Sequence, residues 1–190
     1  MQCVARARSV WLSSAVDAMV EQHRVSLSLG SNIDAERHLL SALSALRTRF
    51  NVRAISPVYQ TPAVGFDGDD FLNLAAIIDS DLDALALNDW LHTLEDAHGR
   101  RRDQPRHSAR TLDIDIVFFD DLVMRGPGNL QVPRPELQHA FVLKPLFDLV
   151  PEQVVPGTTS TLAALWSQHP EHASPIWNGS ARFLPSSAST

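Results

Sequence analysis

The order of apolar and polar residues predicts an alternation of strands and helices. Residues 25–29, Val-Ser-Leu-Ser-Leu, alternate strictly, as in a strand with one buried face. Within residues 35–50 the leucines recur at helical spacing, and Asn32 or Asp34 is available to cap the start of that helix. We expect strands over residues 25–29, 51–59, 71–79 and 111–119, helices over 35–50, 82–98 and 160–168, and a loop over 60–70.

The resulting order, β-α-β-β-α-β, indicates an α+β fold. It is the ferredoxin-like arrangement, in which two helices cover one side of a sheet. Gly99 is expected to end the second helix, and Pro57 to place a bulge or a sheet edge near the end of the second strand. The remainder, with the apolar run 141–150 and the last helix, is expected to form a C-terminal extension to this core.

The length of the chain, 190 residues, is that of one domain. We expect the folded domain to span residues 25–170. Residues 1–24 differ in composition and are expected to be a disordered extension, with Met19 as a hypothetical natural start. Residues 171–190 are expected to be a tail that ends in disorder.

Composition excludes several classes of protein. The single cysteine, Cys3, rules out an internal disulfide framework and a cysteine-based zinc site, and it fits a cytoplasmic location. No apolar run approaches the ~20 residues of a membrane helix. The net charge of -6 argues against a general nucleic-acid binder. Lys144 is the only lysine, so the chain has no P-loop lysine and must hold a nucleotide in another way.

The chemistry is expected in residues 99–119, Gly-Arg-Arg-Arg-Asp-Gln-Pro-Arg-His-Ser-Ala-Arg-Thr-Leu-Asp-Ile-Asp-Ile-Val-Phe-Phe. Five arginines lie within 100–110, beside a single acid, Asp103. The strand that follows carries Asp113 and Asp115, which point to the same face because side chains alternate along a strand. Paired carboxylates suit Mg²⁺, and arginines suit phosphate oxygens. The pattern favours metal-assisted phosphoryl or pyrophosphoryl transfer, and the alternative is an ordinary ion cluster.

Four segments in this order resemble the 6-hydroxymethyl-7,8-dihydropterin pyrophosphokinase family of folate biosynthesis. The resemblance covers about residues 25–168 and implies a ferredoxin-like core. It also implies an enzyme that moves the β,γ-pyrophosphoryl unit of ATP to the hydroxymethyl oxygen of a reduced pterin and releases AMP. The segments are SLGSNI at 28–33, SPVYQTPAVG at 56–65 with FLNLA at 71–75, EDAHGRRR to RTLDIDIVFF at 95–119, and VPRPEL with AFVLKPL at 132–146.

The resemblance implies roles for individual residues around ATP. Asp113 and Asp115 would hold two Mg²⁺ ions, and Arg100 and Arg110 would act as the catalytic arginines of a mobile loop. The residues that it places near the nucleotide are Glu95, Arg102, Arg106, His107, Ile116 and Arg134.

For the pterin, the resemblance implies a pocket with an amide and two aromatic rings. Asn73 would offer a donor and an acceptor to the amide-like edge of the ring, and Phe71 and Phe141 would sandwich the ring. Taken without the family, these two phenylalanines are more often core residues. The other residues that it assigns to the pocket are Gly30, Thr61, Pro62 and Val64.

This chain departs from the family pattern at three places. The family's W-G-P-R before T-L-D is replaced by His107-Ser108-Ala109-Arg110, and its V-P-H motif by Val132-Pro133-Arg134. A common arginine before A-F-V-L is His139. These changes concern ATP affinity and loop closure more than the aspartate pair.

Two other hypotheses compete with an active pyrophosphokinase. A ferredoxin-like nucleic-acid-binding module is possible by fold, but the chain lacks the K/R-G-F-G-F-V-x-F signature and is acidic. The second is a catalytically altered paralogue that binds pterin or nucleotide. We expect a monomer, with a dimer as the alternative, and neither nucleic acid nor membrane as partner.

Overall fold

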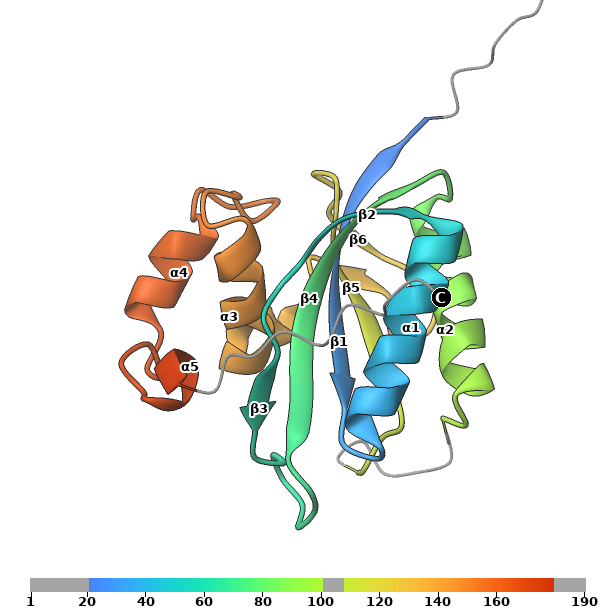
Figure 1. Cartoon of the computed structure of the whole chain (residues 1–190). Coiled ribbons are helices and arrows are strands. Elements are labelled where there is room, and N and C mark those ends of the chain that lie inside the picture. Colours follow the sequence, from blue (N-terminus) through green and yellow to red (C-terminus); the bar gives the residue numbers. More distant parts are fainter. Residues whose placement is uncertain (1–20, 101–107, 180–190) are drawn as a thin grey trace, which may run out of the picture.

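The computed structural model describes residues 21–100 and 108–179 (Figure 1). Its central sheet and the two helices of the core follow the predicted order. In the described part of the chain, no helix is long and apolar enough to cross a membrane. The core elements are β1 (His23–Ser31), α1 (Ala35–Arg49), β2 (Asn51–Ile55), β3 (Tyr59–Thr61), β4 (Phe71–Ser80), α2 (Ala84–Ala97) and β5 (Asp113–Phe119). The elements that follow are β6 (Met124–Arg125), β7 (Gln131–Val132), the 3-10 helix η1 (Pro135–Gln138), α3 (Ala140–Leu149), α4 (Leu162–Gln168) and α5 (Ile176–Gly179).

The sheet has the order β2-β4-β1-β5, and β3 also pairs with β4. Each of these pairs is antiparallel. The outer strands are thus β5 on one side and both β2 and β3 on the other, while the first strand lies inside the sheet. This is the ferredoxin-like α+β arrangement that the sequence predicts.

The second predicted strand, 51–59, is divided into β2 and β3 in the structure. Ser56 and Pro57 lie between them, and Pro57 has no backbone N–H to give to a ladder. Ser56 bonds β4 in another way, because its N–H donates to the Ala75 carbonyl and its Oγ accepts from the Ala75 N–H, each at 2.9 Å. Thr61, expected in a loop, belongs to β3.

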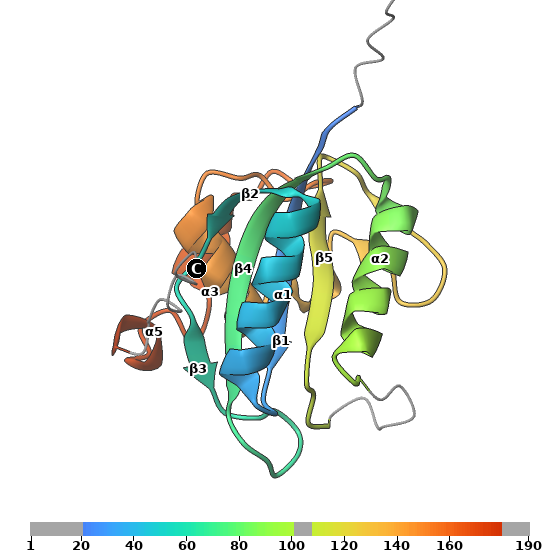
Figure 2. The same ribbon diagram turned by 45° about the vertical axis from the view of Figure 1, so that its right-hand side comes forward.

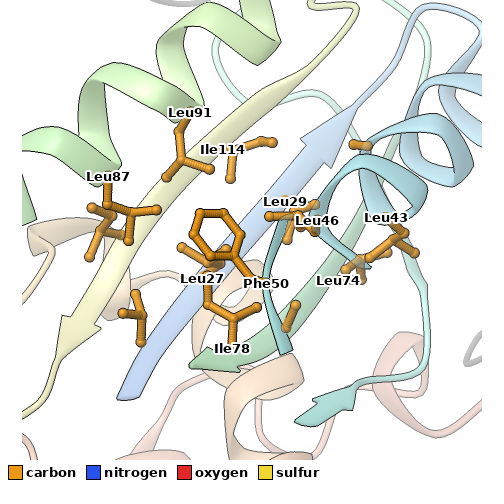
Figure 3. Packing of buried hydrophobic residues seen from close by; sticks show 14 of the residues in the cluster. Leu27, Leu29, Leu43, Leu46, Phe50, Leu74, Ile78, Leu87, Leu91 and Ile114 are labelled. Carbon is orange, nitrogen blue, oxygen red and sulfur yellow. The ribbon is translucent and has the colours of Figure 1, made fainter. Parts of the chain in front are cut away.

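Helices α1 and α2 cover one face of the sheet, as Figure 2 shows. The residues of this core alternate along the strands, so that Leu27 and Leu29 of β1 face the helices. Figure 3 shows them with Leu46 of α1 and Leu91 of α2 in one layer. Phe50 packs edge-on against Trp90, with ring centroids 4.9 Å apart, and so links the two helices at one end.

The two helices begin differently. Asp83 caps α2 as expected of an N-cap residue, since its Oδ1 accepts from the backbone N–H groups of Leu85 and Ala86 at 2.9 Å. Asp34 precedes α1 in a left-handed conformation and makes no side-chain cap hydrogen bond. The predicted cap by Asn32 or Asp34 is therefore wrong. At the end of α2, Gly99 has φ of 78° and its N–H donates to the Asp96 carbonyl, so this glycine ends the helix as predicted.

The C-terminal extension covers part of the opposite face of the sheet (Figure 1). Helix α3 packs on β4, and the buried side chains of this second core include Ala75, Ile77, Leu143 and Leu146. Trp177 of α5 is also buried and lies against Tyr59, with ring centroids 5.4 Å apart. The packed structure thus extends beyond residue 170, where the sequence suggests that the domain ends.

A polar cluster joins the extension to the sheet. The Tyr59 hydroxyl donates to Asp148 Oδ2 at 2.5 Å, and the Lys144 ammonium bonds the other oxygen of Asp148. Lys144 also lies over the rings of Tyr59, Phe147 and Trp166 at 5.1 to 5.8 Å. The chain's only lysine is therefore part of the packing between α3, α4 and β3.

Replacing Tyr59 by phenylalanine should lower the free energy of unfolding by about 1–3 kcal/mol, because Asp148 loses a hydrogen bond made to its charged form. Urea denaturation of the variant and of the parent protein measures the difference. Ser28→Ala, in strand β1 of the same sheet, is a control for a lost hydroxyl. Equal midpoints for Tyr59→Phe and the parent would show that the hydrogen bond contributes nothing.

Candidate active site

The candidate site is built on two rows of residues that run across three strands. Asn73 of β4, Gly30 of β1 and Asp113 of β5 are direct neighbours in the sheet register. The next row consists of Ala75, Ser28 and Asp115 in the same strands. Directly opposite residues share a face, so Asn73 and both aspartates point away from α1 and α2.

Arginines from both ends of the undescribed segment 101–107 meet at Asp113. Arg100 Nη1 bonds Asp113 Oδ1, and Arg110 Nη1 lies 2.5 Å from Asp113 Oδ2. The predicted catalytic arginines are thus brought to the same carboxylate. Asp115 has a cation of its own, since Arg134 Nη2 lies 2.8 Å from Asp115 Oδ1. Three guanidinium groups therefore compensate two aspartates.

Glu95 holds the first of these arginines. Its side chain is buried, 1% exposed, and its Oε1 bonds Arg100 Nη1 and accepts the Ile114 N–H at 2.8 Å. Burial raises the pKa of Glu95 to about 7, although Arg100 and the Ile114 N–H favour its charged form. The geometry makes Glu95 a support for Arg100 and for the start of β5.

The environment of Asp115 disfavours the charged form of its carboxylate. The surrounding protein raises the pKa of Asp115 above its usual range, chiefly by removing its carboxylate from water and then through repulsion by Asp113. A divalent cation between the two would relieve that repulsion. The described residues contain no group of three or more His, Cys, Asp or Glu side chains placed to hold a metal. The two adjacent carboxylates fit Mg²⁺, which is usually bound through one or two carboxylates and keeps waters and substrate phosphates as its other ligands.

The connection between β1 and α1 fixes the backbone of Arg110. Asn32 Oδ1 accepts the Arg110 N–H at 2.6 Å, while the Asn32 and Ile33 N–H groups donate to the Arg110 carbonyl. Ser31 Oγ donates to the Thr111 carbonyl at 2.6 Å. Asn32 Nδ2 also donates to the Asp69 carbonyl, in the loop before β4. The sequence predicts a helix-capping role for Asn32, and the glycine-serine-asparagine run after the predicted strand 25–29 is the signal for its role in the site.

Asn73 has a defined orientation beside this cluster. Its Nδ2 donates to Thr61 Oγ1 at 2.8 Å, and both side chains are buried. A Cβ at Gly30 would lie 3.1 Å from Asn73 Oδ1 and 3.8 Å from the Phe71 ring, so glycine leaves room for both side chains. The structure thus places Gly30, Thr61, Phe71 and Asn73 together.

The remaining predicted site residues are more dispersed. Phe71 meets Phe66 edge-on, and Phe141 stacks on His139 with ring centroids 5.2 Å apart. Val64 is exposed, as is Pro62. The side chain of Ile116 packs in the core beneath α1 and α2, on the face opposite the aspartates. Arg102, Arg106 and His107 lie outside the described residues.

Comparison of the sequence with models of known protein families gives a match over most of the folded part of the chain. The model of the family described as 7,8-dihydro-6-hydroxymethylpterin-pyrophosphokinase (HPPK) matches residues 26–151. The chain belongs to the HPPK family. The matched range includes both aspartates, the three arginines around them, Asn73 and Phe141.

Curated relatives support this assignment. The 2-amino-4-hydroxy-6-hydroxymethyldihydropteridine pyrophosphokinase of Pseudomonas aeruginosa is 39% identical over 138 residues, covering 70% of this chain and 84% of that protein. The bifunctional protein FolKE of Lactococcus lactis is 39% identical over 129 residues, 65% of this chain. This HPPK chain spans only 36% of the length of that bifunctional relative.

Solved structures agree on the fold. The HPPK-DHPS protein of Plasmodium falciparum superposes with a TM-score of 0.65 at 14% identity, over 78% of this chain and 45% of that one. A mutant of it with pterin and p-hydrobenzoate gives a TM-score of 0.66 at 14% identity, over 84% and 44% of the respective chains. At this identity the likeness establishes the HPPK fold alone.

Replacing Glu95 by glutamine should change how stability depends on pH. The pKa of Glu95 is about 7 in the folded protein and ~4.5 in the unfolded chain, so folding favours the neutral carboxyl. The protein therefore loses stability as the pH rises from 4.5 to 7. One pKa unit corresponds to ~1.4 kcal/mol, so the difference amounts to about 3 kcal/mol. Relative to the parent protein, Glu95→Gln should therefore become more stable by up to this amount between pH 4.5 and 8. Urea titrations at both pH values measure the change, and a constant difference would refute the raised pKa.

Proposed function

We propose that this chain transfers the β,γ-pyrophosphoryl group of ATP to the hydroxymethyl group of 6-hydroxymethyl-7,8-dihydropterin, in folate biosynthesis. The hydroxymethyl oxygen attacks the β-phosphorus and loses its proton to solvent, the bond to the α,β-bridging oxygen breaks, and AMP leaves. The observation that carries the proposal is the row Asn73, Gly30 and Asp113. This row places the Asn73 amide, which is suited to the amide-like edge of a pterin, near the Asp113 carboxylate, which is suited to a metal ion that also binds phosphate.

The aspartate pair is proposed to hold Mg²⁺. Asp113 and Asp115 offer adjacent carboxylates on one face, and the predicted second ion would share these ligands. When bound, the metal would neutralise phosphate charge and orient the phosphate chain. The repulsion that raises the pKa of Asp115 would be relieved by the bound cation.

The arginines are proposed to exchange partners when ATP binds. Arg100 and Arg110 neutralise Asp113, and Arg134 neutralises Asp115. With these carboxylates bound to a metal, the guanidinium groups would be free to contact phosphate oxygens in a bidentate manner. Arg100 and Arg110 would meet the charge that develops on the transferred group, and Arg134 would contact the nucleotide in place of the family histidine.

The pterin is proposed to lie beyond the N-terminal end of α3, against the face of the sheet that carries Asn73. Asn73 Oδ1 faces Gly30 while its amide nitrogen is held by Thr61, which fixes the direction of its donor and acceptor. Phe71 and Phe141 would lie on either side of the ring, with Pro62 and Val64 at the margin of the pocket.

Among the residues expected near the nucleotide, Glu95 is proposed to act through Arg100, because Glu95 is buried. Ile116 could face the nucleotide only through its backbone, because its side chain lies in the core. The roles proposed for Arg102, Arg106 and His107 rest on the sequence.

Pterin-dependent release of AMP tests this function. Purified protein is incubated with ATP and Mg²⁺, with and without 6-hydroxymethyl-7,8-dihydropterin, and AMP is quantified by chromatography. AMP that depends on both pterin and Mg²⁺ supports the proposal. A folded protein that binds pterin and releases no AMP would instead be a catalytically altered paralogue.

The nucleic-acid hypothesis is disfavoured by the residue types on the sheet face opposite α1 and α2. That face carries Asp113, Asp115 and Asn73 in the positions where a sheet that binds RNA would present stacking aromatics. A salt-titrated RNA binding assay separates the two functions. The cytoplasmic location and the monomeric state stay predictions.

A further inference from the structure

Two histidines form a hydrogen-bonded pair between α1 and α2, outside the residues assigned above. His38 lies in the first turns of α1 and is buried, and His98 follows the last residue of α2. Their Nδ1 atoms are 2.7 Å apart. His38 Nε2 lies 2.9 Å from Arg37 Nη2, and His98 Nε2 lies 3.4 Å from Ser41 Oγ.

These contacts define where the protons are. A guanidinium group only donates, so His38 Nε2 must accept from Arg37 and the proton of His38 lies on Nδ1. His38 Nδ1 then donates to His98 Nδ1, which places the proton of His98 on Nε2, towards Ser41. The chain Arg37, His38, His98, Ser41 therefore requires both imidazoles to be neutral. A proton added to either one sets two donors against each other.

The pair is attached to the end of α2 from which Arg100 extends. The His98 N–H donates to the Leu94 and Glu95 carbonyls, and the Arg100 N–H donates to the same Glu95 carbonyl at 3.1 Å. Arg100 is two residues beyond His98, and its guanidinium reaches Glu95 and Asp113. The Phe50 and Trp90 rings link α1 to α2 at the other end, so the histidines hold the end near the site.

We propose that His38 and His98 are positioning residues for Arg100, because their neutral Nδ1–Nδ1 hydrogen bond fixes the end of α2 against α1. This inference rests on the proposed function, in which Arg100 acts on the phosphates. Neither histidine touches substrate. Loss of this hydrogen bond displaces the Cα of Arg100. The contact of its guanidinium group with the transferred phosphate in the transition state is then weakened more than the binding of the substrates in the ground state.

The charged groups around the pair make it sensitive to pH. Among the described residues, burial and Arg37 disfavour a proton on His38, while Asp34 favours one. Burial, His38 and Arg37 all disfavour a proton on His98. Both pKa values are therefore lowered, so the pair is intact at neutral pH and its contribution to stability is lost as pH falls through the lowered pKa values.

Three variants separate positioning from simple packing. His98→Leu removes the acceptor, whereas His98→Asn keeps an oxygen near the position of Nδ1 and does not titrate. His172→Asn, at an exposed histidine beyond α4, is the matched control. Steady-state kcat and KM are measured from pH 5 to 8, together with thermal unfolding, and each variant is compared with the parent protein at the same pH.

At pH 8 we expect His98→Leu to lower kcat about tenfold with KM for pterin within twofold, since a small misplacement of a reacting group costs up to ~10²-fold. His98→Asn should restore most of kcat, and below pH 6.5 it should lose less activity than the parent. A fully folded His98→Leu protein with parental kcat, or an unchanged profile in His98→Asn, would overturn the proposal.

A second measurement does not depend on turnover. ¹⁵N NMR of the histidine side chains should show the Nδ1–H tautomer for His38 and Nε2–H for His98 at pH 8. The Arg100 amide should shift as the pair titrates in the parent and in His172→Asn, and the shift should be absent in His98→Leu. If the chemical shift of the Arg100 amide did not change as the histidines titrate, the positioning role would be overturned. Absence of AMP formation in the parent protein, with the amide shift intact, would instead contradict the proposed function alone.

Discussion

Replacing Asp115 by alanine should abolish pterin-dependent AMP formation and leave pterin binding largely intact. Asp115 contributes one of the two carboxylates proposed for Mg²⁺, whereas the pterin amide is proposed to bind Asn73, which lies two strands away. Loss of a metal worth several kcal/mol in the transition state corresponds to a fall in kcat of about 10³-fold or more. Turnover is measured as AMP release, and pterin affinity by isothermal titration calorimetry.

The variant should remain folded. Removing Asp115 leaves Arg134 with its contacts to Glu136 and to the Asn129 carbonyl, and it ends the repulsion with Asp113. Asp121→Ala, at an exposed aspartate beyond the end of β5, changes the net charge equally and is the matched control. If Asp115→Ala turned over at the rate of the control, the carboxylate pair would not be a metal site.

Much of the fold could be predicted because it depends on local patterns. The alternation in residues 25–29 and the leucine spacing of 35–50 each report which face is buried, and the structure confirms the strand and the helix. The order of these elements then leaves few topologies. The division of residues 51–59 into β2 and β3 was not predictable in detail, because it depends on how Ser56 bonds Ala75 of a distant strand.

The sequence predicts that the two aspartates lie together on one face of the sheet, but it does not predict which arginine pairs with which aspartate. The spacing of Asp113 and Asp115 fixes that they share a face, whichever strands flank them. That Arg100 and Arg110 converge on Asp113 while Arg134 serves Asp115 depends on three chain segments that meet only in the folded protein. Asn32 illustrates the limit of local reasoning, because a residue suited to cap a helix instead bonds Arg110 and Asp69 across the site.

Replacing Arg110 by alanine should lower kcat by about 10²- to 10³-fold, the loss typical of one donor that stabilises developing charge, with a much smaller change in KM. The side chain can be removed without releasing the segment, because Asn32 holds the backbone N–H and carbonyl of Arg110. The effect should therefore be confined to the guanidinium group. Steady-state kinetics with ATP and pterin varied separately measure both constants.

The charge and the geometry of the guanidinium can be tested separately. Arg110→Lys retains the charge but not the two-pronged contact, so it should recover only part of kcat. Arg125→Ala, at an exposed arginine of β6, is the control for loss of one positive charge. A change in KM for ATP with kcat preserved would assign Arg110 to ground-state binding of the nucleotide. The fall in kcat is expected because Arg110, which is proposed to leave Asp113 when ATP binds, would contact phosphate most strongly where charge develops in the transition state.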